Sequence, residues 1–115
     1  MRKIVAALAG IVAMGTLVSA QGAAKVEAGK VAFTAQKCTT CHKAEGVGGK
    51  LASNLDGVGA KRTEAEIRKW LTSPAELEAK ITPKPKMPMS GFMKKHKLSD
   101  ADVDALTAYV MSLKK

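Results

Sequence analysis

The sequence predicts a small all-α domain built from three to four short helices. Three observations support this fold class. Apolar residues recur at helical spacing, hydroxyl side chains stand shortly before acidic residues as helix-start signals, and no run of residues alternates between apolar and polar as strands do. The 115 residues suffice for one such domain and not for two.

Residues 1–20 have the layout of a secretory signal peptide. A basic start precedes a mostly apolar run at residues 4–18, and the small residues Ser19 and Ala20 resemble a cleavage site. The run is shorter than the roughly 20 residues that a membrane-spanning helix needs, and a retained membrane helix is the alternative. We expect cleavage after Ala20, a mature domain at residues 21–115, periplasmic localisation and no stable membrane insertion.

The predicted helices follow in order along the mature chain. The first covers about residues 26–37 and precedes a glycine-rich loop at residues 45–59. A second helix is expected after Thr63, whose hydroxyl can accept the amide N–H of Glu66 in a capping box. A third is expected to begin at Pro74, because proline is favoured at the first helical position.

A proline-rich strap and a last helix complete the expected fold. Residues 82–88 contain three prolines, which exclude a helix and force an extended backbone. The last helix is expected to start after Ser99 and to end near Leu113, with its apolar residues on one face.

Basic residues outnumber acidic ones, with 19 Lys and Arg against 10 Asp and Glu. Removal of residues 1–20 leaves 17 basic and 10 acidic side chains, a net charge of +7. The basic residues are mostly dispersed lysines and aromatic residues are few, so nucleic-acid binding is not expected. The positive surface is expected either to be simply solvated or to steer the protein toward acidic partners.

A C-x-x-C-H motif at Cys38, Cys41 and His42 carries the chemistry of the chain. This motif is typical of c-type haem attachment. Two thiols at this spacing can each add to one of the two vinyl groups of a haem, and the next residue is then held below the iron. The motif therefore predicts one covalent haem c, bound through both cysteines, with His42 as an axial iron ligand.

Three other roles for the two cysteines stay open at this point. In an oxidising compartment, Cys38 and Cys41 can form a disulfide. A thioredoxin-like redox pair requires a βαβ surrounding, which the sequence does not predict, and a structural zinc site requires four ligands, although only His96 remains beyond the motif. Haem attachment is favoured because the motif follows an export signal and contains every cysteine in the chain.

The second axial ligand has to come from another segment. A methionine thioether is soft and neutral, and together with histidine it raises the reduction potential of haem iron. Met87 is favoured because it lies in the proline strap, where the restricted backbone has little conformational freedom left to lose. Met89, Met93 and His96 are the alternatives, whereas Met111 falls on the last predicted helix and is expected in the core.

These motifs make the chain similar to the class I monohaem cytochromes c of the small exported bacterial type. The resemblance extends from about residue 26 to residue 114. Besides the C-x-x-C-H motif, the residues that carry it are Gly29, Phe33, residues 55–62, Trp70, Leu71, Pro74, residues 86–88, Leu106, Tyr109 and Val110. The resemblance implies a small cytochrome c fold, in which the helices wrap around one covalently bound haem.

The resemblance also implies roles for single residues. The first and last helices would cross closely beside the haem, with Gly29 permitting the approach and Phe33 packing against Leu106 and Tyr109. The strap's Met-Pro pair resembles the family's axial methionine loop and supports Met87 over its neighbours.

One position departs from the family's pattern. Ser53 stands where a proline is common, but its backbone carbonyl can still accept the N–H of His42. The resemblance further implies that Trp70 lies near the haem, where it could bind a propionate, and that Lys61 or Arg62 could neutralise one.

The expected function is electron transfer rather than catalysis. A six-coordinate iron has no open position for a substrate, and no separate catalytic constellation stands out in the sequence. The protein is expected to be a periplasmic carrier, not an enzyme, that docks briefly on acidic redox protein partners. The alternatives are an electron-transfer subunit of a larger oxidoreductase and a ligand-binding or sensory haem protein with an open iron position.

Overall fold

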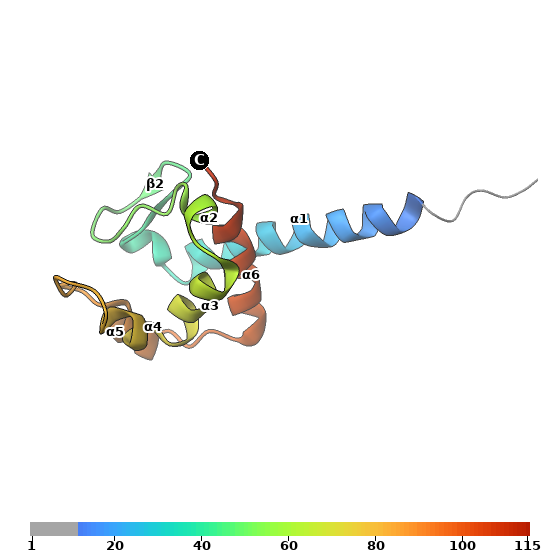
Figure 1. Ribbon diagram of the computed structural model, residues 1–115. Coiled ribbons are helices and arrows are strands. Elements are labelled where there is room, and N and C mark those ends of the chain that lie inside the picture. The colour runs from blue at the N-terminus through green and yellow to red at the C-terminus, as the bar shows by residue number, and fades with distance from the viewer. Residues whose placement is uncertain (1–11) are drawn as a thin grey trace, which may run out of the picture.

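The computed structural model describes residues 12–115. Much of the predicted signal peptide, residues 1–11, lies outside the described residues. In chain order the elements are α1 (Val12–Ala35), the 3-10 turn η1 (Cys38–Thr40), β1 (Lys43–Ala44), β2 (Val47–Gly48), α2 (Val58–Lys61), α3 (Glu64–Thr72), α4 (Pro74–Glu78), α5 (Met89–Lys95) and α6 (Asp100–Ser112) (Figure 1). The predicted all-α class is confirmed, because helices dominate the described chain and the only strands in it are two residues long.

Two short helices were not expected from the sequence. α2 occupies the end of the predicted glycine-rich loop, and it begins after Gly57, whose φ of 87° lies in the left-handed region that glycine favours. α5 begins directly after Pro88, where the strap ends. Both helices are too short for an apolar period to be visible in the sequence, which explains why three to four helices were predicted although residues 12–115 contain six.

The first helix is longer than the predicted residues 26–37. α1 already includes Val12, and the residues that lead into the predicted helix are alanine-rich and free of proline, so they favour continued helix. α1 stops at Ala35, and Lys37 takes a left-handed φ of 62° that turns the chain. None of the helices in the described part of the chain carries an apolar stretch long enough to cross a membrane.

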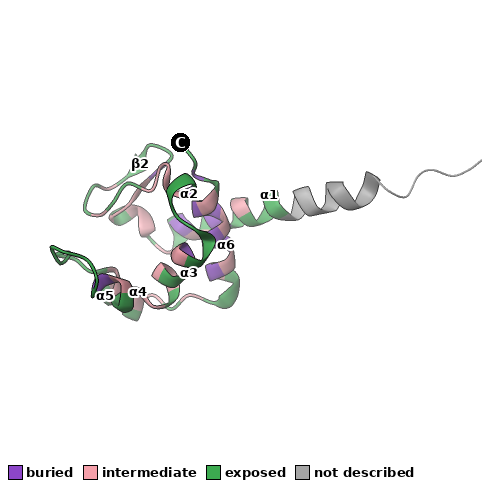
Figure 2. Cartoon of the chain, viewed as in Figure 1, coloured by how far each residue is buried: buried purple, intermediate pink, exposed green. Residues whose placement is uncertain are grey.

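The crossing of α1 and α6 forms the core. Gly29 makes it possible, because a Cβ atom at this position would collide with the backbone oxygen of Ala105. Phe33 then packs on Tyr109, with ring centroids 5.6 Å apart and planes inclined by 58°, and both join Leu106 in one buried cluster. Figure 2 shows the buried residues gathered at this crossing. These contacts confirm the packing that the resemblance implied.

The predicted helix starts are confirmed in most details. Glu66 N–H donates to the Thr63 hydroxyl at 3.2 Å, and the Thr63 N–H donates to the Glu66 carboxylate at 3.1 Å. Ser99 and Asp102 form an equivalent capping box at the start of α6. α4 starts at Pro74 as expected, but the side chain before it makes no capping hydrogen bond. The strap at residues 82–88 is non-helical, as its prolines require.

Candidate functional site

The tight turn after α1 brings the three residues of the C-x-x-C-H motif together. The N–H groups of Cys41 and His42 both donate to the carbonyl of Cys38, at 3.3 and 3.0 Å. This turn places the two cysteines one helical turn apart, with the histidine directly after the second. Both cysteines are free and partly buried. The turn therefore presents two separate thiols and an imidazole from a single short segment.

Burial changes the reactivity of the first cysteine. Removal from water raises the pKa of the Cys38 thiol to about 11, because a thiolate would lose its hydration there. The thiol of Cys38 is therefore protonated at neutral pH and is a poor nucleophile on its own.

The imidazole of His42 is held by a backbone carbonyl. Its Nδ1 lies 2.8 Å from the oxygen of Ser53. Because a carbonyl oxygen can only accept a hydrogen bond, Nδ1 must carry the proton, and the lone pair is left on Nε2. This is the tautomer that can ligate a metal through Nε2. The hydrogen bond expected despite the missing proline is confirmed.

Three backbone hydrogen bonds hold the loop that presents Ser53. Gly49 N–H donates to the carbonyl of Thr39, Ala52 N–H to Cys41 and Leu55 N–H to Lys43, at 2.8, 2.9 and 2.8 Å. These bonds wrap residues 49–55 around the motif. They restrain the loop at the position where a proline ring would have restrained it. The sequence could not predict these bonds, because any residue type other than proline can make a backbone N–H hydrogen bond.

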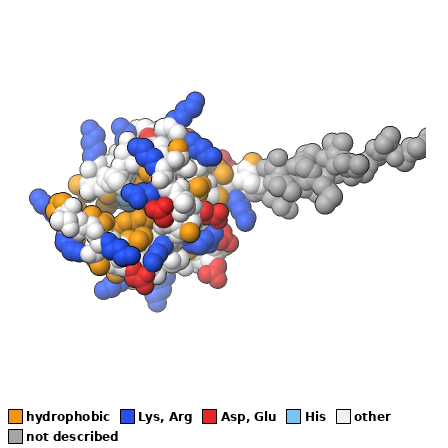
Figure 3. Space-filling model, viewed as in Figure 1, with side chains coloured by type: hydrophobic (Ala, Val, Ile, Leu, Met, Phe, Trp, Pro, Cys, Tyr) orange, Lys and Arg blue, Asp and Glu red, His pale blue; other side chains and the backbone are white. Residues whose placement is uncertain are grey.

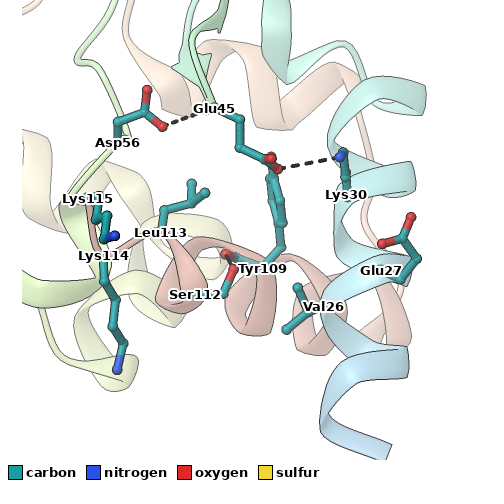
Figure 4. Close-up of a pocket in the computed structure, with 10 residues that line it drawn as sticks. All are labelled: Val26, Glu27, Lys30, Glu45, Asp56, Tyr109, Ser112, Leu113, Lys114 and Lys115. Carbon is teal, nitrogen blue, oxygen red and sulfur yellow. Dashed lines mark hydrogen bonds and ion pairs between the residues drawn. The ribbon is translucent and has the colours of Figure 1, made fainter. Parts of the chain in front are cut away.

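A hairpin after the motif depends on residues that sequence reasoning missed. Glu45 and Gly46 have positive φ values of 51° and 75°, and Asp56 accepts both of their backbone N–H groups, at 2.5 and 3.0 Å. Tyr109 on α6 donates its hydroxyl to the Glu45 carboxylate at 2.8 Å. Lys30 approaches the same carboxylate at 3.7 Å (Figure 4). The motif segment is thereby tied to both helices of the core.

This cluster also lines an open pocket, shown in Figure 4. The pocket has a volume of about 570 Å³ and mixed acidic and basic walls. Neither the two cysteines nor the histidine of the motif contributes to it. The pocket is therefore separate from the place where a haem held by the motif would lie.

The methionine chosen from the sequence lies on a different segment. Met87 belongs to the exposed strap, and 63 % of its surface is accessible to solvent. The structure therefore does not pack its thioether against the motif. Met89 and Met93 lie on α5 and are partly buried. His96 is engaged locally, since its ring stacks on a neighbouring phenylalanine and its Nδ1 lies 3.1 Å from that residue's carbonyl oxygen.

A hollow lies beside these segments. Figure 3 shows hydrophobic side chains gathered in it, with Lys and Arg side chains around its edge. Figure 1 shows the strap and α5 on one side of the domain and the hairpin with its preceding turn on the other. The free thiols, the Nε2 lone pair of His42 and the hydrophobic hollow together fit a c-type haem.

The contacts of the three residues expected at the haem propionates do not show whether they bind a propionate. Arg62 forms an ion pair with Glu66 at 3.3 Å, and Lys61 is exposed. Trp70 is partly buried on α3. Their roles toward a haem stay predictions.

Comparison with known proteins gives one match. The chain matches the sequence model of the cytochrome c family over residues 26–114, which include the motif, the strap and α6. No curated protein and no solved structure matches the chain. The match spans most of the chain and agrees with the helical fold and with the donor groups on the turn. The chain therefore belongs to the cytochrome c family, whose members transfer electrons with a covalently bound c-type haem.

Proposed function

We propose that this protein is a periplasmic electron carrier with one haem c, held by thioether bonds from Cys38 and Cys41. His42 and Met87 are the axial ligands of the iron. The observation that carries the proposal is the 2.8 Å hydrogen bond between His42 Nδ1 and the carbonyl of Ser53, directly beside two free thiols. When bound, the haem supplies an iron that accepts and returns one electron.

The two cysteines make the attachment. Each thiol adds its S–H across one vinyl group, so that one C–S bond forms and no by-product leaves. The buried Cys38 thiol is protonated at neutral pH, so a base or an assisting factor would have to take its proton as the C–S bond forms, and a proton would be returned to the other vinyl carbon. A covalent bond of this kind keeps the cofactor in place through repeated changes of its charge.

His42 supplies the proximal ligand. The carbonyl of Ser53 fixes the proton on Nδ1 and restricts rotation of the ring, so Nε2 is presented in one orientation. A hydrogen bond from the other ring nitrogen also makes the ligating nitrogen more basic. The imidazole is therefore suited to both oxidation states of the iron without a change of protonation.

Met87 supplies the sixth ligand in this proposal. Its thioether is neutral and soft, which favours the reduced iron and raises the reduction potential. The high exposure of Met87 means that few protein contacts would have to break for the side chain to turn inward. The same exposure is also the one observation that favours the alternative function, a ligand-binding haem protein with an open iron position.

Acidic redox proteins are the proposed partners. Exposed lysines cluster on the strap, at Lys84 and Lys86, on α5, at Lys94 and Lys95, and just before the strap, at Lys80. Figure 3 shows basic side chains around the hollow, where they can direct docking toward its opening. Electron transfer to an acidic partner should therefore slow as ionic strength rises, whereas a rate independent of salt would argue against docking by charge.

The attachment is tested by spectra of protein made in a host that exports and matures c-type cytochromes. We expect a pyridine haemochrome spectrum typical of haem c, a mature chain that begins at Gln21, and a low-spin ferric iron with a thioether-to-iron band. Cys38→Ala together with Cys41→Ala should abolish haem that survives denaturing electrophoresis. A high-spin ferric spectrum with ready carbon monoxide binding after reduction would instead establish the open-iron alternative. Co-purification with a stable catalytic partner would identify a subunit of a larger oxidoreductase.

A further inference from the structure

The proline strap is attached to the domain through one buried acidic residue. Glu78 is the last residue of α4 and is only 9 % exposed, although the strap residues that follow it are all exposed. Its carboxylate accepts the backbone N–H of Ser90 at 2.8 Å. The chain therefore leaves α4 at Glu78 and is bound back to the same residue just beyond the strap.

This hydrogen bond caps α5 from outside the helix. Pro88 is the N-cap residue of α5 and makes no side-chain capping bond, since proline has neither a hydroxyl nor a carboxylate. Ser90 is the second residue of α5, and its N–H would have no partner within the helix. Glu78 supplies the missing acceptor, and its negative charge lies at the helix end that favours an anion.

Glu78 is buried, so its hydrogen bond to Ser90 is shielded from competition with water. Carboxylates are rarely buried unless a cation or several donors compensate for the lost hydration. Among the salt bridges of residues 12–115, none reaches Glu78. Within the described residues, the N–H of Ser90 is the hydrogen-bond donor to this carboxylate, so it offsets part of the lost hydration and fixes the side chain.

A second contact holds the other end of the strap. The Lys84 ammonium donates to the backbone carbonyls of Glu78 and Ala79, at 3.2 and 2.9 Å. Met87 lies three residues from Lys84 and three from Ser90, so the chain is tied to the end of α4 on both sides of the methionine. The tip between them is exposed and has few contacts of its own.

We propose that Glu78 is a positioning residue for the axial methionine. The inference rests on the proposed ligation by His42 and Met87. By fixing Ser90 to α4, Glu78 shortens the free loop that carries Met87 and reduces the conformational freedom that the loop loses when the thioether binds iron. Without this contact, Met87 leaves the iron for a larger fraction of the time.

The test measures how often the sixth position is open in the haem-loaded full chain. Added imidazole binds ferric iron only when the methionine has left, so its apparent affinity is proportional to the open fraction. Glu78→Leu removes the acceptor and should raise the apparent imidazole affinity about tenfold, as expected for one lost charge-assisted hydrogen bond. Glu78→Gln keeps an oxygen acceptor and should stay within about threefold of the unmodified protein. Glu76→Leu, on the exposed face of the same helix, is the control and should not change the affinity.

The outcomes separate this role from the ligation itself. Absence of the thioether-to-iron band in the unmodified protein refutes Met87 ligation, and the role of Glu78 with it. If the band is present and Glu78→Leu binds imidazole no more tightly than Glu76→Leu, ligation by a methionine stands and the positioning role of Glu78 is wrong. If Glu78→Leu does not accumulate as holoprotein, Glu78→Asp repeats the test, because the charge is kept and the reach is one methylene shorter. An unchanged affinity in Glu78→Asp would overturn the proposal equally.

Discussion

The replacement of Gly29 by alanine tests the central helix crossing. A methyl group here would collide with the carbonyl oxygen of Ala105 and with the Cβ atom of Tyr109. The obstacle at Ala105 is backbone, so no rotamer change can relieve it, and α1 must move away from α6. Separation of the two helices loosens the buried cluster of Phe33, Leu106 and Tyr109. We therefore expect Gly29→Ala to destabilise the fold.

Two effects of opposite sign decide the magnitude. Alanine is a better helix former than glycine by about 1 kcal/mol in the middle of a helix. Overpacking of a well-packed core costs about 1–3 kcal/mol, and a collision with rigid backbone belongs at or beyond the upper end. Gly29→Ala should therefore lower the free energy of unfolding by about 2 kcal/mol. For a domain of this size, such a loss lowers Tm by roughly 8–16 °C.

Thermal and urea unfolding of the haem-loaded protein, followed by far-ultraviolet circular dichroism, measure the loss. Gly91→Ala is the matched control, because a Cβ at Gly91 in α5 meets nothing within 4 Å. This control should be neutral or more stable by up to about 1 kcal/mol. A Gly29→Ala protein with the same Tm as the unmodified protein would refute the close crossing as the reason for glycine at this position.

Two further predictions concern polar contacts that bind distant segments. Tyr109→Phe removes the hydroxyl that donates to Glu45 and should lower the free energy of unfolding by about 1 kcal/mol in urea titrations at pH 7. Burial raises the pKa of Tyr109, and the hydrogen bond to Glu45 raises it further. The stability that the protonated phenol contributes should therefore be lost as the pH rises above about 10. This loss should be absent from Tyr109→Phe. The hydrogen bond from Arg68 lowers the pKa of Asp104, so this pair should stabilise the fold above about pH 4 and lose that stabilisation as the pH falls below it. Acid unfolding of Asp104→Asn should lack this part of the transition. An acid transition that is the same in Asp104→Asn and in the unmodified protein would contradict the assignment.

Local features of this fold could be predicted from the sequence, and pairings between distant segments could not. The capping box at Thr63 and the strap at residues 82–88 depend on residues close together in the chain, so their chemistry is visible as a pattern. The approach at Gly29 was implied by family resemblance rather than by spacing. The bonds from Tyr109 to Glu45 and from Glu78 to Ser90 depend on how the helices pack, and no local pattern indicates either acceptor.

The candidate site divides in the same way. The motif predicts Cys38, Cys41 and His42 as the attachment site without any structure, because attachment chemistry requires these residue types at this spacing. The carbonyl that orients the imidazole was expected at Ser53 and is present there. The choice of Met87 from the strap stays a prediction, because the structure places its side chain in solvent.

The two proposed iron ligands are held in very different ways. His42 belongs to a segment bound by its own turn, by three backbone bonds from the following loop, and by a hairpin tied to α6 through Tyr109. Met87 belongs to an exposed strap whose nearest bonds to the rest of the domain are made by Glu78 and Lys84. Segments with few buried contacts open at lower free energy than the core. In the proposed ligation by His42 and Met87, we therefore expect the methionine side to open first, and we expect its two attachments at the end of α4 to determine how long the iron stays six-coordinate.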